Sequence, residues 1–322
     1  MQILTNTNTV TSVTAPLVQQ QAELDTAYER LRNGRLALGL DELLEGLRAR
    51  CEEEPETWPE YARACLKHPV SRLLNQDPFT YRAFSKPRGY AGDAVMMDYI
   101  YGLGEARQAT AAATPLGRAI FQYLDTRSPA KSGVRHRRRL LAGLIDRIAN
   151  RGGTRVLAIA AGHLREVELS DAVQRGKLEE FVALDQDEAS LAAVARDYAH
   201  LGIQTINGSV REILTGQLNP GQFDLVYAAG LFDYLNAPVA AALTCRMFDM
   251  TRPGGLMLIP NFLPGVKDRG YMESFMDWHL VYRDHADMKA LAGGLPQSAV
   301  ADCQIFNDDE GAIVYLQVSK AS

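Results

Sequence analysis

From Thr154 to the end of the chain, short apolar runs alternate with segments of helix length. The first five runs are RVLAIAA (155–161), EEFVALDQD (179–187), IQTINGS (203–209), FDLVYAAG (223–230) and GLMLIPNF (255–262). This alternation is typical of an α/β fold, a doubly wound, mostly parallel sheet with crossover helices on both faces. The last two runs, AVADCQIF (299–306) and GAIVYLQVSK (311–320), are separated only by NDDE. They predict an antiparallel C-terminal hairpin, which completes a seven-stranded sheet.

The segment before this sheet has a different pattern. Over residues 19–150 apolar residues recur at helix spacing, for example after Asp41, a potential N-cap, and Asp77 followed by Pro78 is a typical helix start. We therefore expect a helical cap over residues 19–150, which forms the substrate domain, and a sheet domain over residues 151–322. Residues 1–18 are rich in Thr and Asn and are expected to be flexible.

Composition excludes several classes of protein. The net charge of −5 and the pI of about 5.7 provide no basic field, so we expect no nucleic-acid partner. The four cysteines are scattered without metal-ligand spacing, and we expect no metal site. Neither a secretory signal nor a membrane-spanning run is visible, which predicts a cytoplasmic protein without membrane insertion.

The turn after the first run, AAGHL, contains one glycine. A dinucleotide fingerprint needs glycine at its first, third and sixth positions, which here are Ala160, Gly162 and Arg165. NAD or FAD is therefore disfavoured. S-adenosyl-L-methionine has no pyrophosphate, and its binding needs only one close approach of the backbone, which Gly162 provides. We expect this cofactor.

The other strand ends fit the same cofactor. Asp185 ends the second run, where an acidic residue can bind ribose hydroxyls in such folds. Small residues follow the third and fourth runs, although Ser209 could equally be a helix N-cap. The residues predicted to contact the cofactor are Ala160, Gly162, His163, Asp185, Gln186, Gly208, Ser209, Val210, Ala228, Ala229 and Gly230.

Together these strand ends resemble a class I S-adenosylmethionine-dependent methyltransferase, with its Rossmann-like fold. KPRGYAGDA (86–94) and MDWHLVYR (276–283) are more distinctive, and they resemble the bacterial methyltransferases that make 3-hydroxypalmitic acid methyl ester. The resemblance implies a fatty-acid-like acceptor. The sequence departs from the usual class I loop at Ala158, where an acidic residue is common, and at Ala160 and Leu164, where glycines are common. Glu166 or Asp233 could replace the acidic contact.

The acceptor determines which groups are needed. A carboxylate acceptor needs a cation or hydrogen-bond donors, whereas a hydroxyl or amine acceptor also needs a general base. The catalytic candidates are His279 as the base, with Tyr282 and Arg283 as orienting groups; a histidine on a partly apolar segment can also be structural. The residues predicted to bind substrate are Arg88, Tyr90, Phe232, Tyr234, Asn261 and Trp278, with Phe232 and Tyr234 equally plausible as core.

The basic run VRHRRR (134–139) places Arg135, Arg138 and Arg139 on one helix face and Arg137 nearer the apolar stripe. Most such runs are solvated surface, but an arginine here could bind the cofactor carboxylate, or the run could bind an acyl carrier protein. The predicted function is methyl transfer to the carboxylate or hydroxyl of a small, fatty-acid-like acceptor, and three other functions stay open. These are an N- or O-methyltransferase of a heteroaromatic natural product, a cofactor-sensing regulator and a nicotinamide oxidoreductase.

Overall fold

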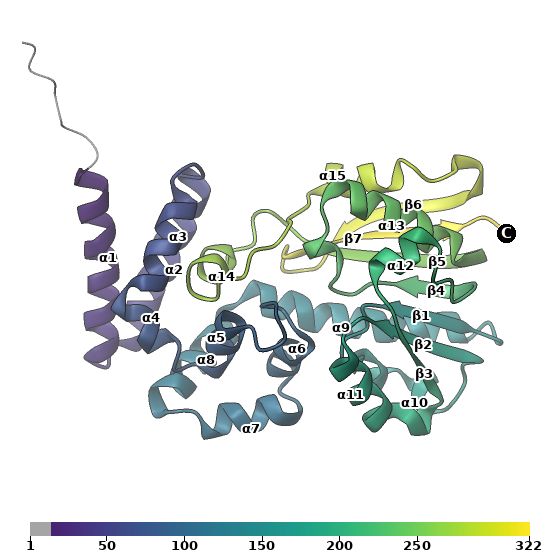
Figure 1. Ribbon diagram of the computed structural model, residues 1–322, viewed down its shortest axis with the longest axis horizontal. Helices are drawn as coiled ribbons and strands as arrows, with labels where there is room; N and C mark the ends of the chain where they lie inside the picture. Colours follow the sequence, from purple (N-terminus) through teal and green to yellow (C-terminus); the bar gives the residue numbers. More distant parts are fainter. Residues whose placement is uncertain (1–13) are drawn as a thin grey trace, which may run out of the picture.

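The computed structural model describes residues 14–322. The segment 1–18, expected to be flexible, lies outside them except for its last residues, which begin the first helix. Figure 1 shows two halves, helices at one end of the molecule and a sheet with its helices at the other. None of the helices in the described part of the chain is long and apolar enough to cross a membrane.

Helices build the first half of the chain. Their bounds are α1 Thr14–Arg32, α2 Leu36–Glu53, α3 Trp58–Lys67, α4 Pro69–Leu74, α5 Pro78–Ser85, α6 Ala94–Tyr101, α7 Gly104–Ala112, α8 Pro115–Arg127 and α9 Pro129–Ala149. Asp77 and Asp93 cap α5 and α6, since each side chain accepts two backbone N–H groups of the helix it precedes. Asp41 is not an N-cap, because α2 begins earlier, at Leu36.

Strands and helices alternate in the second half of the chain. The strands are β1 Arg155–Ile159, β2 Glu180–Asp185, β3 Ile203–Asn207, β4 Phe223–Tyr227, β5 Thr251–Phe262, β6 Val300–Asn307 and β7 Ile313–Lys320. The helices are α10 Asp171–Gln174, α11 Glu188–Tyr198, α12 Val210–Thr215, α13 Ala237–Asp249, α14 Arg269–Phe275 and α15 His285–Ala292. Short 3-10 helices add η1 Arg165–Leu169, η2 Ala199–Leu201, η3 Phe232–Tyr234 and η4 Gln297–Ala299.

The seven strands form one sheet in the order β3-β2-β1-β4-β5-β7-β6. Strands β1 to β5 pair parallel with one another, whereas β7 pairs antiparallel with both β5 and β6. The predicted fold class is confirmed, including the antiparallel C-terminal hairpin. The position of β7 between β5 and β6 is a detail that the order of the apolar runs does not predict.

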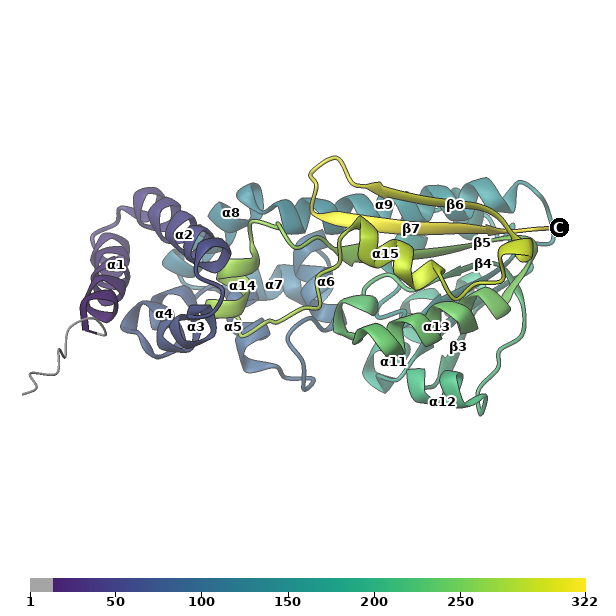
Figure 2. The same ribbon diagram turned by 90° about the horizontal axis from the view of Figure 1, so that it is seen from above.

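Both faces of the sheet are covered, which explains why its strands are apolar without alternation. On one face Val156 and Ala158 belong to a core that α9 covers; on the other, Leu157 and Ile159 belong to a second core, against α13 and α15. Figure 2 shows α9 and α13 on opposite sides of the sheet. The central strands are therefore packed on both faces, and their carboxyl ends lie along one well-supported edge of the sheet.

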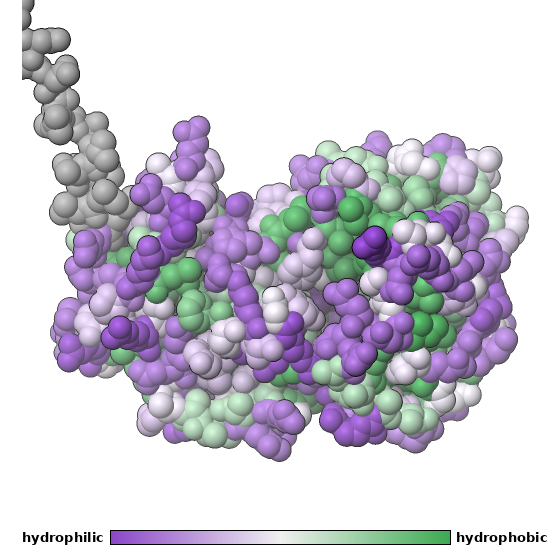
Figure 3. Space-filling view, viewed as in Figure 1, coloured by the Kyte–Doolittle hydropathy of each residue, from purple (hydrophilic) through white to green (hydrophobic). Residues whose placement is uncertain are grey.

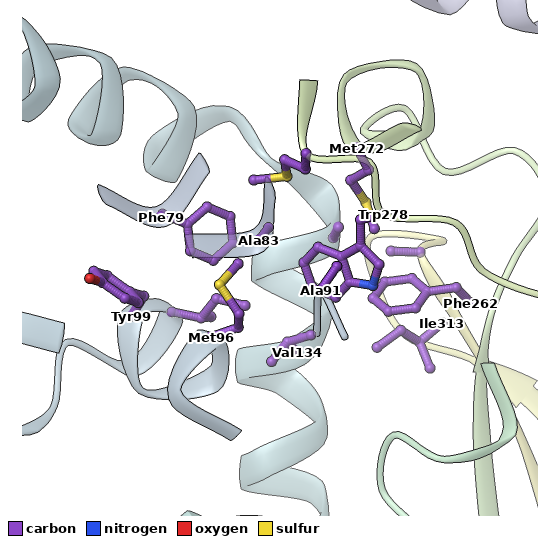
Figure 4. Close-up of a cluster of buried hydrophobic side chains, with 14 of the residues drawn as sticks. Phe79, Ala83, Ala91, Met96, Tyr99, Val134, Phe262, Met272, Trp278 and Ile313 are labelled. Atoms are coloured by element: carbon purple, nitrogen blue, oxygen red, sulfur yellow. The ribbon is translucent and has the colours of Figure 1, made fainter. Parts of the chain in front are cut away.

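The chain returns from the sheet into the helical half after β5. There α14 packs against α2 and α3, and the indole N–H of Trp58 donates a 2.6 Å hydrogen bond to Glu273. Figure 4 shows the apolar cluster at this junction, with Trp278 between Ala91 of the cap and Phe262 at the end of β5. The helical half therefore contains α14 from beyond the predicted boundary at residue 150, in addition to the helices that precede that boundary.

Candidate active site

A cavity of about 780 Å³ lies between the carboxyl ends of the parallel strands and the helical cap. The strand side contributes the turns after β1, β2, β3 and β4, and the cap side contributes α5, α6, α8 and α9. Its size falls within the range of about 300–1,000 Å³ that is usual for ligand pockets. In Figure 3 hydrophobic surface gathers where the helical half meets the sheet half. The cavity occupies the place where open α/β sheets bind their ligands.

The turn after β1 has the backbone of a three-glycine loop although it contains one glycine. Ala160, Gly162 and Leu164 all adopt the left-handed region, with φ of 51°, 55° and 52°. This conformation costs an L-residue with a side chain about 1–2 kcal/mol. These three positions are the ones where class I loops commonly carry glycine. The loop therefore retains the usual shape at the expense of strain at Ala160 and Leu164.

Asp185 at the end of β2 holds this loop in place. One carboxylate oxygen accepts the Gly162 N–H at 2.8 Å, and the other accepts the Asp187 N–H at 2.8 Å. Burial raises the pKa of Asp185, while these backbone donors oppose that rise. Asp185 and its neighbour Gln186 both line the cavity. Because each carboxylate oxygen has a further lone pair, Asp185 can still accept hydrogen bonds from a ligand.

The ends of β3 and β4 contribute small residues. Gly208, Val210, Ala229 and Gly230 line the cavity. Ala228 is fully buried in the core behind it and does not. Ser209 also stays outside the lining, because its side chain forms a capping box with Glu212 at the start of α12. The N-cap alternative for Ser209 is the one that the structure adopts.

Opposite charges face the cavity from α9 and from the segment after the β1 loop. Arg137 is 5% exposed, and its guanidinium donates to Met97 Sδ at 3.6 Å. Glu166 is 8% exposed and accepts a 2.5 Å hydrogen bond from the Tyr227 hydroxyl. Burial raises the pKa of Glu166, and Arg137 counteracts this. Among the described side chains no carboxylate forms an ion pair with Arg137, so a buried cation lines the cavity without a counter-charge in direct contact.

Asp233, after β4, is a second buried acid in the lining. It is 3% exposed, and one carboxylate oxygen accepts the Phe262 N–H at 2.8 Å. Burial raises the pKa of Asp233 to about 6, and the charges of Arg137 and Arg283 limit the rise. Both alternatives to the acidic contact missing at Ala158, Glu166 and Asp233, therefore border the cavity.

Three predicted residues have structural positions instead of cavity positions. Arg283 is buried and donates 2.7 Å hydrogen bonds to the Phe232 carbonyl and to Asn261 Oδ1. Asn261 in turn donates to the backbone carbonyl of Val281 at 2.9 Å. Phe232 is fully buried in the core of the α13 face. These contacts tie the segment after α14 to the ends of β4 and β5, and none of the three lines the cavity.

His279, Tyr282 and Arg88 also lie outside the cavity lining. The imidazole of His279 is 59% exposed and lies 3.2 Å from Asp277. Tyr282 packs its ring under the guanidinium of Arg269. Arg88 donates to Asp187 at 2.8 Å, at the start of α11. His279 is therefore not in position to act as the predicted base, because its side chain is exposed while the neighbouring Trp278 lines the cavity.

His163 faces the cavity from the β1 loop and is 7% exposed. Its Nδ1 lies 2.8 Å from Asp98 on α6, and its Nε2 lies 3.4 Å from Arg88. Although burial opposes this, hydrogen bonds from His163 and Arg165 lower the pKa of Asp98. Both ring nitrogens of His163 are therefore engaged within the protein.

An aromatic cluster closes the cavity between the cap and the strand ends. Trp278 donates its indole N–H to the Tyr234 hydroxyl at 2.9 Å, and the rings of Tyr90 and Tyr234 meet edge to face. Gly92 lies against both partners, since a Cβ there would be 2.6 Å from Trp278 Cζ2. All four residues line the cavity. Sequence reasoning found the three aromatic residues and missed Gly92.

The cap side of the cavity is largely apolar. The lining there includes Phe79, Met97, Ile100, Val134, Tyr271 and Met272. Met97 and Ile100 line the cavity, whereas Met96 and Tyr99 of the same helix are buried in the core. The sequence shows that such residues are apolar but does not distinguish a cavity wall from core packing.

Comparison with known proteins agrees with this geometry. Residues 156–255 match the family described as "Methyltransferase domain". The chain carries a class I methyltransferase domain. The methyltransferase takes its methyl group from S-adenosylmethionine. No curated protein sequence matches it.

Solved structures resemble the methyltransferase over most of its length. A protein of Bordetella parapertussis described as a possible exported protein is 16% identical, with a TM-score of 0.60, and the match covers 87% of this chain and 96% of that one. Magnesium protoporphyrin IX methyltransferase from Synechocystis PCC 6803 is 11% identical, with a TM-score of 0.46 and coverage of 70% and 92%. An N-methyltransferase from Bradyrhizobium japonicum WM9 is 13% identical, with a TM-score of 0.42 and coverage of 68% and 98%.

Proposed function

We propose that the methyltransferase converts the carboxylate of a largely apolar, fatty-acid-like molecule into its methyl ester. The observation that carries this proposal concerns His163. It is the only histidine lining the cavity in the described part of the chain, and both of its ring nitrogens are engaged, by Asp98 and Arg88. A hydroxyl or amine acceptor would benefit from an unengaged base, whereas a carboxylate needs none.

The residues at the strand ends fit S-adenosylmethionine. Asp185, Gly208 and Val210 line the cavity; we assign Asp185 to the ribose hydroxyls and the two small or apolar residues to the adenine. Glu166 and Arg137 provide an anion and a cation for the ammonium and the carboxylate of the methionine part. The buried Arg137 guanidinium, without an ion pair among the described residues, is the strongest sign of a bound anion.

S-adenosylmethionine supplies a methyl group activated on a sulfonium. The transfer forms one bond between a carboxylate oxygen and the methyl carbon and breaks the bond from that carbon to sulfur, whose electrons stay on sulfur. No proton moves. The protein therefore contributes mainly by aligning the two reactants and excluding water. The closed cluster of Gly92, Tyr234 and Trp278 is suited to both tasks.

The cap side of the cavity suits an aliphatic chain. Phe79, Val134 and Met272 provide apolar wall, and each buried methylene contributes about 0.8 kcal/mol. We therefore take a long-chain acid, with 3-hydroxypalmitic acid as the specific candidate, as the acceptor. The resemblance of KPRGYAGDA and MDWHLVYR supports that candidate.

Two arginines of the basic run on α9 are engaged in ion pairs. An acyl carrier protein would need free arginines in the run 134–139, but Arg135 binds Asp125 and Arg138 binds Glu168, and of the arginines in this run only Arg139 is exposed. A free acid is accordingly the preferred acceptor.

The cytoplasm is the proposed location, because the four cysteines are free thiols.

The test uses S-adenosylmethionine labelled in its methyl group, with 3-hydroxypalmitic acid, palmitic acid and a panel of heteroaromatic amines and phenols. We expect label in the acid products, and we expect mild alkali to release it as methanol, since esters hydrolyse and methyl ethers and N-methyl groups do not. Label that resists alkali, or transfer only to the heteroaromatic panel, would contradict the proposal. Calorimetric titration with S-adenosylhomocysteine adds a separate check on the cofactor site. Arg137→Met should weaken its binding at least tenfold, whereas Arg139→Met should not.

A further inference from the structure

The hydrogen bond between Trp278 and Tyr234 fixes the direction in which the Tyr234 hydroxyl donates. An indole N–H can only donate, so at 2.9 Å the phenolic oxygen of Tyr234 must be the acceptor. The hydroxyl hydrogen then has to point elsewhere. Within the described part of the chain, this hydroxyl donates no hydrogen bond to another residue. Tyr234 thus offers an unused donor.

Gly92 confines this hydroxyl to the cavity wall. A Cβ at Gly92 would overlap the Tyr234 oxygen and lie 2.6 Å from Trp278 Cζ2, so the cap loop passes directly over the pair. The ring of Tyr90 adds an edge-to-face contact with a centroid distance of 6.3 Å. The Gly92 backbone and the Trp278 indole therefore border this hydroxyl at the cavity wall, while the Tyr234 residue as a whole is 39% exposed.

The protonation state of Tyr234 also favours a donor role. Burial raises the pKa of Tyr234 well above its usual value, and the neighbouring Asp233 raises it further. A phenol with a raised pKa keeps its proton and is a poor general base. Asp233, Arg137 and Tyr90 are the other titratable groups near it, and none of them accepts its hydrogen.

We propose that Tyr234 donates a hydrogen bond to one carboxylate oxygen of the acceptor and leaves the other oxygen to attack the methyl group. This inference rests on the proposed carboxylate acceptor. Trp278 and Gly92 are positioning residues, because they act only by directing the Tyr234 hydroxyl. This arrangement favours an acceptor that is a planar anion with two equivalent oxygens, because one oxygen accepts the Tyr234 hydrogen bond while the other reacts.

The experiment compares Tyr234→Phe with the wild-type enzyme, using 3-hydroxypalmitic acid as the probe. A hydrogen bond to a charged group is worth about 1.5–3 kcal/mol, so kcat/KM should fall about 10- to 100-fold. The affinity for S-adenosylhomocysteine should not change. Tyr315→Phe is the matched control, because that hydroxyl is buried, has no partner among the described residues and does not line the cavity. It should retain wild-type kinetics.

Trp278→Phe tests the same donor without altering Tyr234. It frees the hydroxyl to rotate, so we expect a smaller loss in kcat/KM, and the double variant should lose no more than Tyr234→Phe alone. Additive losses, or a folded Tyr234→Phe enzyme within twofold of wild type, would overturn the inference while leaving the proposed function intact. If the wild-type enzyme esterifies no acid at all, the proposed function and this inference both fail.

Discussion

At the scale of single residues, the loop after β1 retains a strained backbone that can be relieved. Ala160 has a φ of 51°, in the left-handed region where glycine has no Cβ penalty. Ala160→Gly should therefore raise the free energy of unfolding by about 0.5–1 kcal/mol, after the greater entropy of the unfolded glycine chain is subtracted. Urea unfolding measures this change.

The neighbouring Ala161 is a matched control, because it does not belong to the residues with positive φ. Ala161→Gly should lower the free energy of unfolding by about 0.4–1 kcal/mol. If both glycine variants lose stability equally, the strain assigned to Ala160 is absent in solution.

Asp233 gives the stability of the unliganded protein a specific pH dependence. Its pKa is about 6 in the folded state and 3.8 as an ordinary carboxyl, so between these values the folded state binds more protons than the unfolded state. Stability from this group is therefore lost as the pH rises from about 4 to about 6. Asp233→Asn keeps an oxygen for the Phe262 N–H and removes the titration. At pH 8 it should be more stable than wild type by up to about 3 kcal/mol.

The comparison contains its own control. Near pH 4 both forms carry a neutral side chain at this position, so their unfolding free energies should agree. A difference that does not vary between pH 4 and pH 8 would contradict the raised pKa of Asp233.

At the scale of secondary structure elements, glycines in helices are not equivalent. In α8 a Cβ at Gly117 would overlap the carbonyl oxygen of Gln76, which is backbone and cannot move aside easily. In α9 a Cβ at Gly143 would meet nothing within 4 Å. Gly117→Ala should destabilise the protein by about 1–3 kcal/mol, whereas Gly143→Ala should stabilise it by up to about 1 kcal/mol. Urea midpoints of the two variants on either side of wild type would support this packing; a loss of stability in Gly143→Ala would contradict it.

The strands were predictable because a sheet buried on both faces leaves continuous apolar runs in the sequence. Each run contains most or all of one observed strand, for example FDLVYAAG and β4. The capping role of Asp77 was predictable for a different, local reason, because an aspartate before a proline is a typical helix start. The place of β7 between β5 and β6 was not, because strand order depends on contacts between segments distant in the sequence.

At the scale of the whole molecule, the candidate site is only partly visible in the sequence. The strand ends were found because parallel strands place their carboxyl ends at one edge of the sheet. The segment after α14 was misread at His279, because its side-chain directions depend on the contacts of Arg283 and Asn261 with the ends of β4 and β5. No pattern within MDWHLVYR distinguishes the inward Trp278 from the outward His279.

The shared cavity also predicts how the protein unfolds. The cap and the sheet are joined by α9, by the apolar cluster at Trp278 and by α14, whose Glu273 accepts the Trp58 hydrogen bond. Because neither half closes its core without the other, we expect one cooperative transition even in a chain of 322 residues, a size at which intermediates are common.

The chain's two tryptophans allow a direct test, because Trp58 lies in the cap and Trp278 at the junction. In Trp278→Phe the fluorescence reports the cap, and in Trp58→Phe it reports the junction, while circular dichroism reports all helices in each variant. Within each variant the fluorescence and dichroism midpoints in urea should coincide. S-adenosylhomocysteine should shift both to higher urea together, because it binds only the folded state. A cap signal that changes at lower urea than the dichroism, or that does not respond to the ligand, would mean that the helical half unfolds independently and closes over the strand ends as a separate unit.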